Sequence, residues 1–106
     1  MADIISTVLD GIQHIETCWA MPPSLPYAVY HDRATRRGAD LYNGITEHNI
    51  TIELYAQKPA EDLEALIEQR LDALGIEYVR QEREWIDTEH FFMTVYDFTY
   101  TEKGFA

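Results

Sequence analysis

The sequence predicts an α+β fold, in which one antiparallel sheet of about four to five strands packs against two helices. Two patterns predict this class. Apolar and polar residues alternate over residues 50–55, which is the period of a half-buried strand. Over residues 63–74, leucine and isoleucine recur at the three- and four-residue spacing of an amphipathic helix. The predicted element order is α-(β)-β-β-α-β-β, within a single domain of residues 1–106.

The first half of the chain predicts a short helix followed by strands. Residues 3–9 carry apolar side chains at helical spacing, and residues 13–20 predict an extended segment at the edge of the sheet. Residues 26–31 and 43–55 are rich in β-branched and aromatic residues, so each predicts a strand. The polar segment between them, Asp32 to Leu41, predicts a long hairpin loop.

The second half predicts the main helix and a second hairpin. The helix runs from Pro59 to Leu74, because Pro59 suits a first turn and Gly75 suits a stop. Residues 76–86 and 89–100 predict the two strands of the hairpin. The helix and the sheet are expected to share one apolar core, whose predicted members are Leu63, Leu66, Ile67, Leu71, Ile50, Ile52 and Leu54.

The last predicted strand is apolar on both of its faces. Phe92, Tyr96, Phe98 and Tyr100 point one way, and Phe91, Met93 and Val95 point the other way. A strand of this kind is covered on both sides. One cover is the core of the domain itself, and the second is either the first helix or a neighbouring subunit.

Composition narrows the classes of function. The formal net charge is −11, which argues against general or sequence-specific binding to nucleic acid. No apolar run approaches the roughly 20 residues of a membrane-spanning helix, so no membrane partner is expected. The single cysteine, Cys18, lies beside Trp19 in an apolar stretch and is predicted to be buried.

Several motifs, taken in order, resemble those of the tail terminator or tail completion proteins of long-tailed phages and prophages. The resemblance spans nearly the whole chain. The matching segments are LPYAVY at Leu25 to Tyr30, GAD followed by Tyr42, ITIELY at Ile50 to Tyr55, the helix of Glu61 to Leu74, EWI at Glu84 to Ile86, and VYDFTY at Val95 to Tyr100.

This resemblance implies a structural role in the virion. Subunits of such families have a helix–sheet fold and close into a ring, commonly a hexamer. The ring caps the finished tail tube and joins it to the head, so the implied partners are further copies of the chain, the tail tube protein and the head connector proteins. Assembly would take place in the host cytoplasm, and the ring would remain at the neck of the virion. No catalytic residue, cofactor or metal carries over.

The charges suggest how subunits could meet. Arg33, Arg36 and Arg37 gather in the predicted loop of a strongly acidic chain. The predicted second helix carries an acidic row that includes Glu64 and Glu68, which is either a solvated face or a surface for a basic partner. A ring needs contacts between unlike surfaces, so the loop is expected to be flexible in the free subunit. On assembly it is expected to order either against a neighbour's acidic surface, including Glu64 and Glu68, or against a tail-tube or connector protein.

Two other classes of function remain open. A small regulatory or ligand-binding module would show one closed apolar pocket. An enzyme would need titratable groups that converge in a cleft. The four histidines lie at positions 14, 31, 48 and 90 without a metal-binding spacing, and no nucleophile motif is present, so the sequence predicts no enzyme, no cofactor and no metal site.

Overall fold

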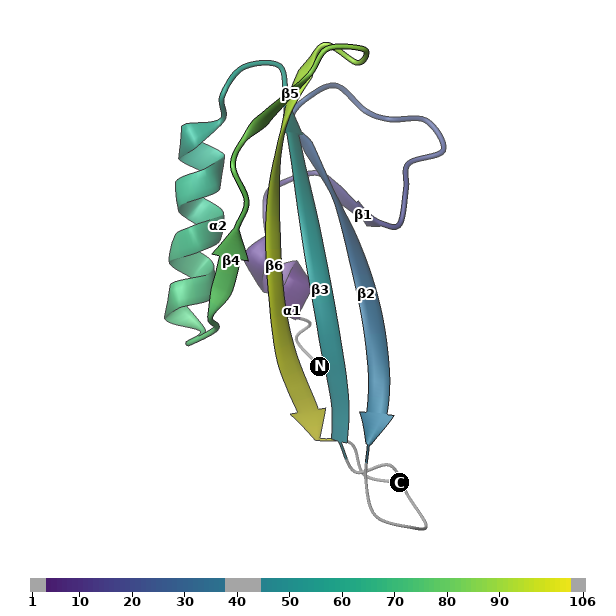
Figure 1. Cartoon of the computed structure of the whole chain (residues 1–106), viewed down its shortest axis with the longest axis vertical. Helices are drawn as coiled ribbons and strands as arrows, with labels where there is room; N and C mark the ends of the chain where they lie inside the picture. Colours follow the sequence, from purple (N-terminus) through teal and green to yellow (C-terminus); the bar gives the residue numbers. More distant parts are fainter. Residues whose placement is uncertain (1–3, 38–44, 104–106) are drawn as a thin grey trace.

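A computed structural model describes residues 4–37 and 45–103 of the chain (Figure 1). It confirms the α+β class, with two helices and a sheet of six strands rather than four to five. The larger number arises because the predicted strand at residues 76–86 is divided in two. The elements are α1 (Ile4–Val8), β1 (His14–Glu16), β2 (Tyr27–Arg37), β3 (Ile45–Ala56), α2 (Glu61–Ala73), β4 (Tyr78–Arg80), β5 (Glu84–Ile86) and β6 (Phe91–Lys103).

The three long strands β2, β3 and β6 form the centre of the sheet. The strand order is β1-β2-β3-β6-β4, and β5 pairs with β6 along the same edge as β4. All pairs are antiparallel except β1 with β2, which is parallel. In Figure 1 the lower ends of the three long strands run on past both helices. The sheet therefore has a two-layer part beneath the helices and a distal, three-stranded part beyond them.

The prediction of a long loop from Asp32 to Leu41 is wrong for its first half. Asp32 to Arg37 continue β2 and pair with β3 residue by residue, from Asp32 opposite Ile50 to Arg37 opposite Ile45. The cause is the antiparallel ladder, whose backbone hydrogen bonds extend β2 although its side chains there are polar. Residues 38–41, the rest of the predicted loop, lie outside the described residues.

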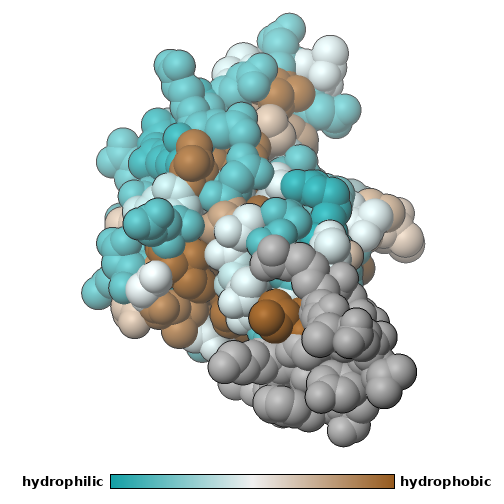
Figure 2. Space-filling model, turned by 60° about the horizontal axis from the view of Figure 1, so that its bottom comes forward, coloured by the Kyte–Doolittle hydropathy of each residue, from teal (hydrophilic) through white to brown (hydrophobic). Residues whose placement is uncertain are grey.

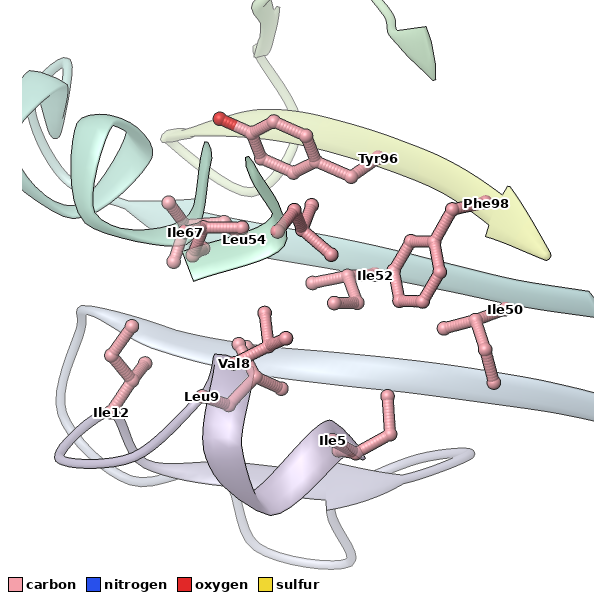
Figure 3. Close-up of a cluster of buried hydrophobic side chains, with 12 residues drawn as sticks. Ile5, Val8, Leu9, Ile12, Ile50, Ile52, Leu54, Ile67, Tyr96 and Phe98 are labelled. Carbon is pink, nitrogen blue, oxygen red and sulfur yellow. The ribbon is translucent and has the colours of Figure 1, made fainter. Parts of the chain in front are cut away.

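The core lies between the sheet and the helices, and Figure 3 shows how its side chains meet. Ile5 and Val8 of α1, Leu9 directly after it, and Ile67 of α2 are at most 2% exposed and pack against the same face of the sheet. Five predicted core residues are confirmed as buried, namely Ile50, Ile52, Leu54, Ile67 and Leu71. Leu63 and Leu66 are partly buried, and Leu63 packs against the edge of the cluster.

The structure also places the two faces of β6. Tyr96 and Phe98 stand opposite Ile52 and Ile50 on β3 and belong to the core, so their face of β6 meets the helices. Since α1 packs into this same core, α1 is not the cover of the other face. We call that other side of the sheet, which faces away from both helices, the open face.

Cys18 is exposed, so the prediction that it is buried is wrong. Only its neighbour Trp19 turns inward, where its indole Nε1 donates to the carbonyl oxygen of Ala28 at 3.4 Å and its ring packs edge-on against Tyr27. Cys18 lies just after β1, where Thr17 has a φ of 74° and the chain leaves the sheet. Among the described residues, no helix is long and apolar enough to span a membrane.

Candidate functional site

The open face has an aromatic end, at the side where β5 and β6 meet. Three rings lie in a row from Tyr27 to Tyr55 and on to Phe91, with ring centroids 5.5 Å and 4.7 Å apart and the ring planes tilted by 44° and 49°. Val29 and Val95 beside them are only 7% and 8% exposed. These side chains shield one another although no helix lies over them, so the face combines apolar character with a fixed shape.

The hydroxyl group of Tyr55, within this aromatic cluster, has a hydrogen-bond partner. The hydroxyl of Tyr55 donates to Glu53 Oε1 at 2.9 Å. Burial, together with this hydrogen bond, holds the pKa of Tyr55 far above its ordinary value, so the hydroxyl stays neutral. A groove of about 260 Å³ runs between the cluster and the loop after β1, and it is lined in part by Cys18, Trp19, Tyr27, Tyr55 and Phe91.

Beyond the aromatic cluster, the open face is polar and carries charges of both signs. Thr51 donates to Asp97 Oδ1 at 2.7 Å, and Gln81 donates to Asp97 Oδ2 at 2.7 Å. Arg33 is exposed, and its Nη2 donates a long hydrogen bond of 3.5 Å to Thr51 Oγ1. Arg33 forms no ion pair with any residue that the structure describes. Its guanidinium group is therefore available to a partner.

Glu64 is the centre of a polar network on the opposite side, beneath α2. Its side chain is 3% exposed, yet it accepts hydrogen bonds from Arg83 at 2.7 and 2.9 Å, from Arg80 at 3.1 Å and from Thr94 at 2.6 Å. The hydrogen bonds from Arg83 outweigh the cost of burial and hold the pKa of Glu64 below its ordinary value. Glu64 therefore fastens α2 to the segment that joins β4 to β5.

Glu68 extends the same network by one helical turn. Arg80 donates to Glu68 Oε2 at 3.1 Å, and the buried hydroxyl of Tyr96 donates to the same oxygen at 2.8 Å. Burial and this hydrogen bond raise the pKa of Tyr96. Both carboxylates are thus paired with arginine side chains of the same subunit.

Not all of the predicted interface residues are accessible to another subunit. The sequence predicted that the acidic row of α2 is either solvated or open to a partner. This prediction is wrong for Glu64, because its carboxylate is buried and already bound by Arg80 and Arg83. Glu68 is partly exposed, and its contact with another subunit stays a prediction. Arg33 lies on the open face. Arg36 and Arg37 lie in β2, paired through their backbones with Thr46 and Ile45.

A histidine cluster in the distal sheet was missed by sequence reasoning. His48 Nδ1 lies 2.9 Å from both carboxylate oxygens of Asp32, and its Nε2 lies 3.2 Å from Glu102. The ring stacks on Tyr100 at 4.5 Å, with an interplanar angle of 7°. Burial alone would lower the pKa of His48, but the hydrogen bonds with both carboxylates outweigh it and raise the pKa. No linear spacing signals this cluster, since it forms across three strands.

This cluster links strands rather than building a metal site. The two ring nitrogens point in different directions, so Asp32 and Glu102 contact opposite sides of the imidazole. Across the described ranges, no group of three or more histidine, cysteine, aspartate or glutamate side chains is arranged to hold a metal ion.

Comparison with known proteins adds no identification: no protein-family model matches the chain, and no curated protein matches it.

Proposed function

We propose that this chain is a structural assembly protein of a long-tailed phage or prophage, which forms a ring at the head–tail junction. The ring would end the tail tube and join it to the head connector. Support comes from the motifs of the resemblance, because LPYAVY, ITIELY and VYDFTY fall on β2, β3 and β6 or directly before them. They therefore specify the central sheet rather than scattered surface loops.

The observation that carries the proposal is the open face. Both helices pack on one side of the sheet, which leaves Tyr27, Tyr55 and Phe91 clustered on the other side. Tyrosine, phenylalanine and methionine are enriched where proteins meet. A fixed aromatic surface on a small acidic domain suits a role in which the domain is one part of a larger assembly.

The charge of the chain agrees with this role. Glu61 and Asp62 at the start of α2 and Asp72 near its end are exposed, and the formal net charge is −11. An acidic surface repels the phosphate backbone. A ring with this surface towards its channel would let DNA pass without binding it.

A ligand-binding module fits less well, and we assign the chain no catalytic role. Such a module would hold its ligand in an enclosed apolar pocket. Three grooves formed by described residues have volumes of about 400, 260 and 310 Å³, and each of the three is open to the surface.

Deletion of the reading frame from the phage genome that carries it tests the proposal. We expect electron micrographs of the lysate to show filled heads that lack tails, together with tails of irregular length. Supplying the wild-type chain from a plasmid should restore infectious particles, and the exposed-site variant Gln69→Ala should do so equally well. Normal virions from the deletion strain would contradict the proposal.

A further inference from the structure

We infer that copies of this chain join edge to edge, with the distal half of β2 pairing in parallel with the distal half of β6 of the next copy. This contact rests on the proposed function, and it specifies how one subunit of the ring would hold the next. The occupant of each free strand edge is thus a second copy of the chain.

Among the described residues, both outer strands of the distal sheet have an edge without a neighbouring strand. β1 covers β2 only from Ala28 to Tyr30, so Asp32 to Arg37 have no described strand on their outer side. β4 covers β6 only from Tyr96 to Phe98, so β6 has no described outer neighbour from Thr99 onward. Long free edges are uncommon in monomeric proteins, since their unpaired backbone groups bind other strands.

The backbone groups at these edges can be assigned from the pairs already made. Ala28 donates to the carbonyl of Gln13 at 2.8 Å, and the carbonyl of Tyr30 accepts from Thr17 at 2.8 Å. Even-numbered residues of β2 therefore turn their N–H and C=O groups outward, and the alternation continues to Ala34. On β6, the carbonyl of Val95 accepts from Gln81 at 2.9 Å, so odd-numbered residues such as Thr99 and Thr101 face outward.

These two sets fit each other in a parallel pair. In a parallel pair, a residue bonds to the two residues that flank its opposite number. If Ala34 stands opposite Tyr100 of the next copy, its N–H meets the carbonyl of Thr99 and its carbonyl meets the N–H of Thr101. Even-numbered residues then face even-numbered residues, so the helix-covered face of one sheet continues into that of the next.

Strand direction favours a ring over a two-fold dimer. β2 and β6 are both antiparallel to β3, so they run in the same direction. Rotation about an axis along the strands therefore brings a neighbour's β6 beside β2 in parallel. The edge of β2 already accepts one parallel partner, β1. A two-fold dimer would instead pair like edges, β2 with β2 or β6 with β6.

Charge also favours unlike edges. Residues 32–37 contain one acidic and three basic side chains, whereas β6, from Phe91 to Lys103, contains two acidic side chains and one basic one, so the first segment has a net positive charge and the second a net negative charge. Pairing β2 with β6 brings opposite charges together, and pairing two copies of either edge brings like charges together.

In the part of the surface that Figure 2 shows in colour, hydrophobic residues form separate patches divided by hydrophilic ones. Backbone hydrogen bonds along a strand edge can supply affinity where apolar area is limited.

Disulfide trapping tests the contact. Thr35 and Thr101 are both exposed, and both stand opposite Glu47, so they lie at one level on either side of β3. Within a subunit they are two strand spacings apart, roughly 9.5 Å, which is too far for a disulfide. Across the proposed contact they are about one spacing apart, roughly 4.8 Å, which permits one. A variant with Cys18→Ser, Thr35→Cys and Thr101→Cys should form covalent ladders and closed rings under oxidising conditions.

Mixing single-cysteine proteins checks which edges meet. The Thr35→Cys and Thr101→Cys proteins, each with Cys18→Ser, should cross-link with each other far more than with themselves. Using Thr99→Cys in place of Thr101→Cys tests a register in which the two strands are shifted by two residues. Homodimers of either single variant in excess over the mixed product would overturn the contact, and so would the absence of any cross-link in both registers.

Ala34→Pro provides a second test that leaves the fold intact. Proline removes the outward N–H of Ala34, which the sheet itself does not use, and such a position tolerates proline. Thermal unfolding should therefore change little, while cross-linking falls about tenfold or more with the loss of this bond. The control Thr35→Pro removes an inward N–H and should destabilise the fold. Undiminished cross-linking by Ala34→Pro would overturn the contact. If rings form but none of these cross-links is found, the edge pairing is wrong, whereas the proposed function is not contradicted.

Discussion

Arg83 donates two hydrogen bonds to Glu64, from Nε to Oε2 at 2.9 Å and from Nη2 to Oε1 at 2.7 Å. The pair joins the first turn of α2 to the irregular segment between β4 and β5. The carboxylate is 3% exposed and the guanidinium group is 24% exposed, so only the arginine keeps contact with water. Removal of the charge on Glu64 should therefore loosen that segment as well as lower the stability of the domain.

Glu64→Gln should lower the free energy of unfolding by about 2 kcal/mol, because hydrogen bonds to a buried charged group are lost. Glu61→Gln is the matched control, since Glu61 lies one turn earlier on α2 and is exposed. It should change stability by less than about 0.5 kcal/mol. Urea unfolding of both variants measures the difference, and equal effects would show that the network does not stabilise the fold.

The same pair predicts a dependence on pH. The pKa of Glu64 is lowered in the folded protein from its ordinary value of 4.5, so its contribution is fully present above pH 4.5. That contribution is lost as the pH falls through the lower, folded pKa. The difference in stability between the wild type and Glu64→Gln should accordingly shrink below pH 4.5. A difference that stays constant down to pH 2 would contradict the assignment.

His48 predicts a change of the opposite sign. Its pKa is raised above 6.5 by Asp32 and Glu102, so its contribution to stability is fully present below pH 6.5. The contribution is lost as the pH rises through the folded pKa. His48→Gln should cost at most about 1 kcal/mol, since Glu102 is partly exposed, and the cost should fade at alkaline pH. Asp32→Asn should weaken the same pH dependence in urea unfolding, and an unchanged profile would count against the cluster.

Ile67 tests the core beneath α2. Ile67 is 0% exposed, so Ile67→Ala should lower the free energy of unfolding by about 2–5 kcal/mol through lost contacts and a residual cavity. Gln69→Ala, at an exposed position of the same helix, should stay within about 0.5 kcal/mol of the wild type. A cost for Ile67→Ala within that range would mean that the buried face of α2 is assigned wrongly.

We also predict that the purified protein binds no metal in stoichiometric amount and needs no cofactor. His31 lies 3.5 Å from Glu53 on the open face, and His90 lies next to Trp85. Neither arrangement supplies the three or four ligands of a zinc site. Elemental analysis after dialysis measures the content. Stoichiometric zinc or manganese that disappears on changing His31 or His90 would refute this prediction.

The arginines of distal β2 are predicted to guide assembly. Changing Arg33, Arg36 and Arg37 together to glutamate should leave the fold intact, since Arg33 forms no ion pair with the described residues. Ring formation and the joining of tails to heads should decline in this variant. Both should also decline for the wild type at high salt, because salt screens the same charges. Neutralising the same three positions with glutamine should give a smaller effect. Assembly as efficient as that of the parent would show that these charges are not an assembly contact.

Local patterns in the sequence were sufficient to predict the element order, apart from the division of residues 76–86 into β4 and β5, and five residues of the core. Residues 50–55 alternate, and residues 63–74 repeat at helical spacing, because burial of one face imposes a period on neighbouring residues. That period is a property of a short segment. Ile52, Leu54 and Ile67 could therefore be assigned to the core without knowledge of their partners, and the structure confirms them as buried.

The tertiary structure alone decided which polar groups meet. Glu64 and Arg83 are 19 residues apart, and His48 and Glu102 are 54 apart, so their contacts depend on strand register rather than on spacing along the chain. Register likewise extended β2 through Asp32 to Arg37, where polar composition had predicted a loop. Hydrophobic burial leaves a signature in each segment, whereas a hydrogen bond between distant side chains exists only after the segments have packed together.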